Sequence, residues 1–310
     1  MASFLGFLPT RRRIVVWLRT HRVLPSKPSR FRLLVTDFQG DDDTLSRTRH
    51  LEAALLDQTE LAILPVSGTP PASDRERLDR CRSLIAGHNG DSLILGDVVP
   101  TNQRIRIRMI SRYEQEPGRH GPYQMGWMEL PETLGPDVAG HLQTLMALSL
   151  SPAARNDRDR ACLINLLRPA ATRLTRLLEE PDRTFDGERQ GVAWHMLGVA
   201  ASLLGDFTES RRWLEVAVHA CRTALLVPDG DADVSRWATV QNNLGQALRR
   251  LAEQQHDRRK RALLLEQSID AFQEAARVHG ADAASAAYLR QTATNLAHAE
   301  ALVQTEPLAA

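Results

Sequence analysis

The chain has 310 residues, of which 43% are hydrophobic and 25% are charged, and its formal net charge is +1. It is long enough for two domains with cores of their own, and its composition is that of a soluble globular protein. The near-neutral charge disfavours nucleic acid as a partner, because no bulk field draws the molecule to phosphate groups. No run approaches the ~20 apolar residues of a membrane span.

The cysteines are Cys81, Cys162 and Cys221, which lie far apart and form no CxxC pair. An odd number at such spacing argues against a disulfide framework and against a cysteine-based zinc site. We therefore expect a cytoplasmic protein.

Residues 1–30 form a basic arm that contains no acidic side chain and is interrupted by prolines. We expect this arm to be loosely ordered, as chain termini often are. Its apolar stretch 14–18 leaves an alternative open, in which the arm touches an acidic partner, nucleic acid or a membrane surface.

Residues 31–130 carry the pattern of a small α/β domain. Buried strands are expected at 31–38, 61–66 and 92–99, with helices around Leu51 and from about Asp74 between them. The stretch 104–109 alternates arginine with apolar residues, which predicts a strand with one dry and one wet face. A last strand is expected within 123–130. The order β-α-β-α-β-β implies a mixed sheet with a parallel core, right-handed crossovers and an antiparallel hairpin at one edge.

From residue 131 onward the apolar spacing is helical. Residues 131–158 are interpreted as a linking helix and a polar hinge, and residues 159–310 as a helical repeat domain. Helices are expected near 162–178, 192–204, 209–226, 234–251, 262–278 and 284–303, with an insertion at about 252–262. The predicted fold class is therefore α/β plus all-α.

The helical half repeats itself weakly. Asn243-Leu244-Gly245-Gln246-Ala247 returns as Asn295-Leu296-Ala297-His298-Ala299, and Trp194, Leu197 and Gly198 form an earlier copy. A turn between two helices is expected at Gly205-Asp206-Phe207. These features fit the tetratricopeptide pattern of Trp, Leu-Gly and a later Ala, although the steps between copies exceed its period of roughly 34 residues. The alternative is a generic helical bundle.

The chain resembles bacterial tetratricopeptide repeat (TPR) proteins whose first part is similar to the TolB amino-terminal domain. The stretches that carry the resemblance are 33–38, 91–98 and 104–108 in the sheet region and 237–248 in the repeat. The resemblance implies a small α/β domain followed by an α-solenoid of antiparallel helix hairpins. It does not imply a mechanism, since such folds serve many functions.

The resemblance also implies a binding groove, because the first helix of each TPR hairpin lines the inner face of the array. Carried over by position, the residues that would bind a protein or peptide are His195, Asn242, Asn243, Gln246, Arg249, Asn295 and His298. Amides pair with main-chain groups and guanidinium groups pair with carboxylates. The alternative is that these side chains are solvated or bond to the adjacent helix.

The sequence carries no phosphate-binding loop, no GxGxxG after a strand, no HExxH and no GxSxG motif. We therefore expect a scaffold or adaptor that is not an enzyme, needs no cofactor and binds a protein or peptide. Whether it also forms a homo-oligomer stays open.

The alternative function is a ligand sensor, or an enzyme-associated signalling domain, with a nucleotide or metal site at the strand ends. Its weak candidate ligands are Asp37, Asp41, Asp42 and Asp43. Helix capping explains the same aspartates more simply.

Arg104, Arg106 and Arg108 project from one face of a predicted strand. We interpret them as charges that keep an edge strand from pairing with another chain. The alternative is that they bind phosphates or an acidic protein.

Overall fold

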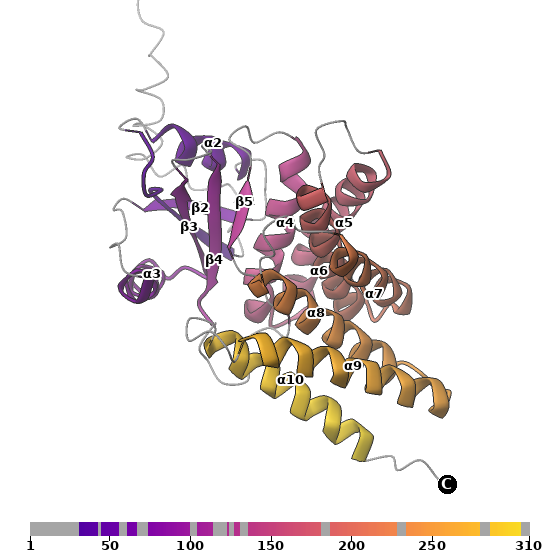
Figure 1. Cartoon of the computed structure of the whole chain (residues 1–310). Coiled ribbons are helices and arrows are strands. Elements are labelled where there is room, and N and C mark those ends of the chain that lie inside the picture. The colour runs from indigo at the N-terminus through magenta and orange to yellow at the C-terminus, as the bar shows by residue number, and fades with distance from the viewer. Residues whose placement is uncertain are drawn as a thin grey trace, which may run out of the picture.

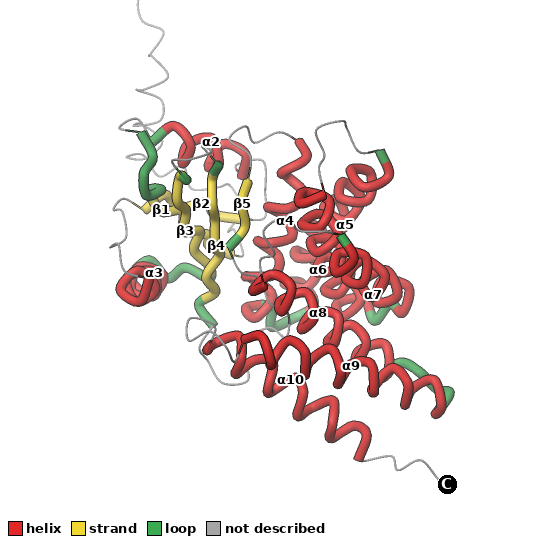
Figure 2. Tube along the Cα trace, viewed as in Figure 1, coloured by secondary structure: helices red, strands yellow, loops and turns green. Residues whose placement is uncertain are grey.

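The computed structural model describes residues 31–42, 45–55, 61–66, 74–99, 104–113, 123, 127–130, 136–180, 187–227, 234–279 and 286–304. The predicted basic arm at 1–30 lies outside these residues. In what is described, a small sheet with its helices lies beside a layer of long helices (Figures 1 and 2). The predicted combination of a small mixed sheet followed by a helical region is confirmed.

The sheet region follows the predicted order β-α-β-α-β-β, and a last short strand lies within the stretch 123–130, as expected. Its elements are β1 (Phe31–Thr36), α2 (Ser46–Leu55), β2 (Leu61–Val66), α3 (Asp74–Gly87), β3 (Ser92–Val98), β4 (Ile105–Ser111) and β5 (Met128–Leu130). The strand order across the sheet is β2-β1-β3-β4-β5. β1 pairs in parallel with β2 and β3, whereas β3 with β4 and β4 with β5 are antiparallel.

Both faces of the sheet centre are buried because apolar residues stand at consecutive positions of β1 and β3. Leu33 and Ile94 belong to the larger core, which reaches the helical layer. Leu34 and Leu93 point to the opposite face and pack with Cys81 of α3. Alternation of side chains along a strand assigns these neighbours to opposite faces. The sheet therefore lies between the helical layer on one face and α3 on the other.

The assignment of the arginine strand to the sheet edge is wrong. β4 pairs with β3 along its length and with β5 from Ile105 to Ile107, so β5 takes the outer position. The arginines make pairs within the chain instead. Arg106 bonds to Asp97 at 2.8 Å and lies 4.5 Å over the Trp127 ring, and Arg104 pairs with Glu129 at 3.2 Å.

The helical layer consists of long helices joined mostly by short connections. They are α4 (Pro136–Leu150), the 3-10 turn η1 (Ser151–Ala153), α5 (Asp157–Glu179), α6 (Gly187–Thr208), α7 (Arg211–Leu226), α8 (Val234–Glu253), α9 (Arg258–His279) and α10 (Ala286–Gln304). The predicted helices are confirmed. The predicted insertion is shorter than expected, because α8 continues to Glu253 and α9 already begins at Arg258.

The predicted turn at Gly205-Asp206-Phe207 is wrong, since α6 continues to Thr208. Gly205 serves packing: a Cβ there would lie 2.6 Å from Leu214 Cδ2 of α7. The chain reverses at Glu209 instead, whose φ of 52° is left-handed. Gly205, which the sequence pattern assigns to a turn, is thus a contact point between two helices.

Consecutive helices pack as antiparallel hairpins, and each first helix carries a glycine at the crossing. A Cβ at Gly198 would lie 2.7 Å from Cys221 Sγ, and one at Gly245 would lie 2.8 Å from Phe272 Cδ1. Gly140 of α4 occupies the same kind of position, 3.2 Å from Leu174 Cγ of α5. The segment interpreted as a linking helix is therefore the first helix of a further hairpin.

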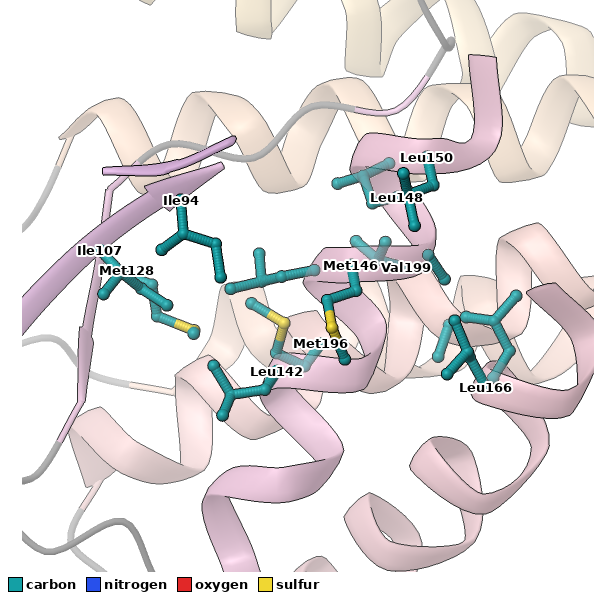
Figure 3. Close-up of a cluster of buried hydrophobic side chains, with 14 of the residues drawn as sticks. Ile94, Ile107, Met128, Leu142, Met146, Leu148, Leu150, Leu166, Met196 and Val199 are labelled. Atoms are coloured by element: carbon teal, nitrogen blue, oxygen red, sulfur yellow. The ribbon is translucent and has the colours of Figure 1, made fainter. Parts of the chain in front are cut away.

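α4 also joins the sheet to the helical layer in one apolar core (Figure 3). On one side of α4 lie Ile94, Ile107 and Met128 of the sheet. Met196 of α6 lies beside Met146 and Leu142 of α4, and Leu166 of α5 lies on the side away from the sheet. All of these side chains are buried. The two regions are thus packed through shared apolar contacts.

Candidate functional site

The helices α4, α6, α8 and α10 form one side of the helical layer, which we call the inner face. Each of them contacts the next in this series, and α4 also contacts β3 and β4. Figure 1 shows α4 beside the sheet and α10 at the far end of the helical layer. The inner face therefore meets the protein's own sheet through α4.

A chain of polar side chains crosses the inner face from α6 to α10, and we call it the amide network. Nδ2 of Asn243 lies 3.0 Å from Nε2 of His195, and Nδ2 of Asn242 donates to Oδ1 of Asn243 at 3.3 Å. Oδ1 of Asn242 accepts from Thr292 Oγ1 at 3.2 Å and from Asn295 Nδ2 at 3.1 Å. All five side chains are buried. Buried amides need such partners, so the network fixes the register of three helices.

His195 is neutral in this network. Burial, and then the positive charge of Arg236, lower its pKa from 6.5 to about 3. The geometry agrees, because an amide nitrogen only donates and Nε2 must then accept. Protonation would bring two donors face to face.

We expect the free energy of unfolding to fall by roughly 2 kcal/mol between pH 8 and pH 5 on account of His195. Its folded pKa lies below its unfolded pKa, so stability is complete above 6.5 and is lost as pH falls towards about 3. Chemical denaturation at several pH values measures this slope. His195→Gln keeps an acceptor for Asn243 and should flatten the slope, and an unchanged slope would contradict the assignment.

A second cluster, which we call the ionic cluster, lies along the same face towards the C-terminal ends of α6 and α8. Asp206 accepts from the Tyr123 hydroxyl at 3.0 Å and from Arg250 Nε at 2.6 Å. Arg250 also pairs with Glu253 at 2.5 Å, and Glu253 pairs with Arg249. This arrangement connects α6 and α8 with Tyr123, which lies between β4 and β5 in the chain.

Burial governs the proton equilibria of the ionic cluster. Burial raises the pKa of Asp206, although Arg250 opposes this. Burial and the nearby Asp206 charge raise the pKa of Tyr123 well above its usual value. For Arg250, burial alone would lower the pKa, but the Asp206 carboxylate and Glu253 outweigh it and raise the pKa. Arg250 thus stays charged as the counter-ion of Asp206.

The predicted binding residues are brought together, but most of them are covered. His195, Asn242, Asn243, Gln246, Arg249 and Asn295 are buried, whereas His298 is exposed. Four of them bond to neighbouring helices in the amide network, as the alternative interpretation stated. Gln246 accepts from Arg249 Nε at 3.2 Å. A partner can therefore reach the rim around His298 directly, and the deeper residues only if helices separate.

The aspartates after β1 bond to the start of α2. Asp41 accepts from the Thr48 amide at 2.9 Å, and Asp42 accepts from the Ser46 amide at 3.1 Å. These are the bonds of helix capping. Asp37 is half-buried, and Asp43 lies outside the described residues. Among the residues that the structure describes, no group of three or more His, Cys, Asp or Glu is placed to hold a metal ion.

Sequence reasoning missed Tyr123, Asp206 and Arg250. Tyr123 was assigned to a strand and Asp206 to a turn, so nothing connected them. No local sequence pattern connects these three residues, because they are far apart in the chain and meet only when the helical layer packs on the sheet. The carbonyl of Tyr123 also accepts from Gln291 of α10 at 3.4 Å.

No protein-family model, curated protein or solved structure matches the chain. None of the helices in the described ranges is long and apolar enough to cross a bilayer.

Proposed function

We propose that the protein is a scaffold or adaptor that binds a protein or peptide through a TPR-like solenoid. The observation that carries the proposal is the repeated hairpin. α4 with α5, α6 with α7, and α8 with α9 each cross at a glycine of the first helix, where an added Cβ would press on the second. Such hairpins bury their apolar faces by stacking, and stacked hairpins offer an extended surface to other proteins.

The partner surface that we propose is the rim of the inner face around His298. This imidazole is exposed, and it feels the charges of Arg249, Glu253 and Arg250. Burial, and then the charge of Arg249, lower its pKa, so it is a neutral donor and acceptor near pH 7. Arg249 lies behind it, buried and paired with Glu253, and its guanidinium group would bind a carboxylate of the partner only after this pair rearranges.

A photo-crosslinking residue at position 298 tests this proposal in the full chain. We expect it to capture a partner protein or a peptide from a displayed library. The same residue at position 161 is the control, because Ala161 is exposed on α5 and belongs to the outer helices. Equal capture at both positions would mean that the rim is not the binding surface.

Arg249→Gln is a second test of the same surface. If the partner presents a carboxylate, this variant should bind it about tenfold more weakly, a loss typical of one charge-assisted hydrogen bond. Arg277→Gln is the matched control, since Arg277 is exposed on α9. Unchanged affinity in Arg249→Gln would remove this residue from the site.

A further inference from the structure

α10 presents a partly apolar strip that runs beside the residues it contributes to the amide network. Leu289, Leu296 and Val303 recur every seventh residue and are only partly covered, with Val303 43% exposed. Ala293 and Ala297 lie beside them and are exposed. A seven-residue apolar spacing is typical of a helix that pairs with another helix along a seam. We call these five residues the α10 seam.

The same positions of α8 show what such a surface packs against. Leu244 and Leu251 are buried in the core that α8 shares with α7 and α9, and Phe272 of α9 presses on Gly245. In the sequence echo, Leu244 and Gly245 correspond to Leu296 and Ala297. In the described part of the chain α10 packs on α9 and on α8, and Ala293, Ala297 and Val303 of the seam stay exposed.

The charges beside the seam favour a second copy of the same helix. Arg290 lies towards the N-terminal end and Glu300 towards the C-terminal end, and both are exposed. If two copies of α10 align antiparallel about the level of residue 295, Arg290 of each copy comes to the height of Glu300 of the other. Ala293 then comes to the height of Ala297, and these small residues allow a close approach. Opposed helix dipoles favour the same orientation.

We propose that the α10 seam is a homodimer interface, in which α10 of one copy packs antiparallel on α10 of the other. The pairing is isologous, so each favourable contact occurs twice. It uses a different side of α10 from His298 and does not depend on partner binding. A single helix pair buries a small area, so we expect a dissociation constant in the micromolar range.

Sedimentation velocity of the full chain from about 1 to 200 μM tests the proposal, and the wild type should shift from monomer to dimer in this range. Ala297→Glu places two carboxylates in the middle of the seam and should weaken dimerisation at least 100-fold. Ala161→Glu makes the same change at an exposed site of α5 and should leave the dimer intact. Thermal melting confirms that both variants are folded.

Charge reversal tests the orientation. Arg290→Glu alone should raise the dissociation constant about five- to thirtyfold, because both symmetry-related pairs are lost. Glu300→Arg alone should have a similar effect, and the double variant should return to within about threefold of the wild type. A wild type that stays monomeric, a dimer that survives Ala297→Glu, or a double variant as weak as the singles would each overturn the proposal. A partner helix that crosslinks to the seam of a monomeric wild type would overturn it as well.

Discussion

Replacement of Gly245 by leucine is expected to destabilise the helical layer by at least about 3 kcal/mol, the upper end of the usual cost of overpacking. A Cβ at this position would lie 2.8 Å from the Phe272 ring, and leucine adds three more carbons to the same contact. Phe272 is completely buried and cannot swing into solvent. Thermal or chemical denaturation followed by circular dichroism measures the loss.

Gly87→Leu is the matched control, because a Cβ at Gly87 meets nothing within 4 Å. The free energy of unfolding of this variant should lie within about 0.5 kcal/mol of the wild-type value, as is usual for surface substitutions. Gly198 offers a second check, since its Cβ would lie 2.7 Å from Cys221 Sγ. Gly198→Ala should be less harmful when combined with Cys221→Ala than alone. Gly245→Leu with an unchanged melting temperature would contradict the hairpin packing.

Arg250→Met is expected to lower the free energy of unfolding by about 3–5 kcal/mol, because it leaves the carboxylate of Asp206 buried without its counter-ion. Tyr123 alone cannot replace the charge of the guanidinium group, although its hydroxyl still donates at 3.0 Å. The folded pKa of Asp206 is already raised by burial and should rise further in the variant. The destabilisation should therefore shrink as pH falls towards 4, where the carboxyl group takes up a proton.

Removing the charge of Asp206 at the same time should restore much of this stability. The double variant Arg250→Met with Asp206→Asn keeps an acceptor for Tyr123 and has no buried unpaired charge. Arg277→Met is the control, because Arg277 pairs with Glu274 at 3.0 Å on the exposed surface of α9, where such pairs contribute little. If Arg250→Met costs no more than Arg277→Met, the ionic cluster does not hold α6 and α8 together.

The elements of the fold were predictable where local pattern and tertiary environment agree. The apolar run at β1 and the alternation at β4 gave the strands, and the helical spacing after residue 131 gave the helices. The predictions failed where a residue type has two uses. Gly205 is predicted to form a turn, but it lies inside a helix and Leu214 packs against it. The arginines of β4 are predicted to protect a sheet edge, but β4 is not at the edge and Arg106 pairs with Asp97.

The candidate site could be predicted only as a set of residues. The position of Asn242 and Asn243 on the first helix of a hairpin follows from the repeat, and the structure does place them on the inner face. Their burial could not be read from periodicity, because it depends on α6 and α10, whose contacting residues are about 50 positions away in the sequence. A polar residue indicates a surface position only when no other polar group can form a hydrogen bond with it. Here Thr292 and Asn295 both donate to Asn242.

The role of α4 has a consequence for anyone who dissects this molecule. A fragment that starts at α5 would lose Leu142, Leu145 and Met146, which are buried between the strands and the later helices. The apolar side chains that these residues cover would become exposed and would favour aggregation. A failed capture by such a fragment would therefore say nothing about the partner. Truncations that respect the architecture should instead keep everything from β1 onward and shorten the chain from its other end, one helix hairpin at a time.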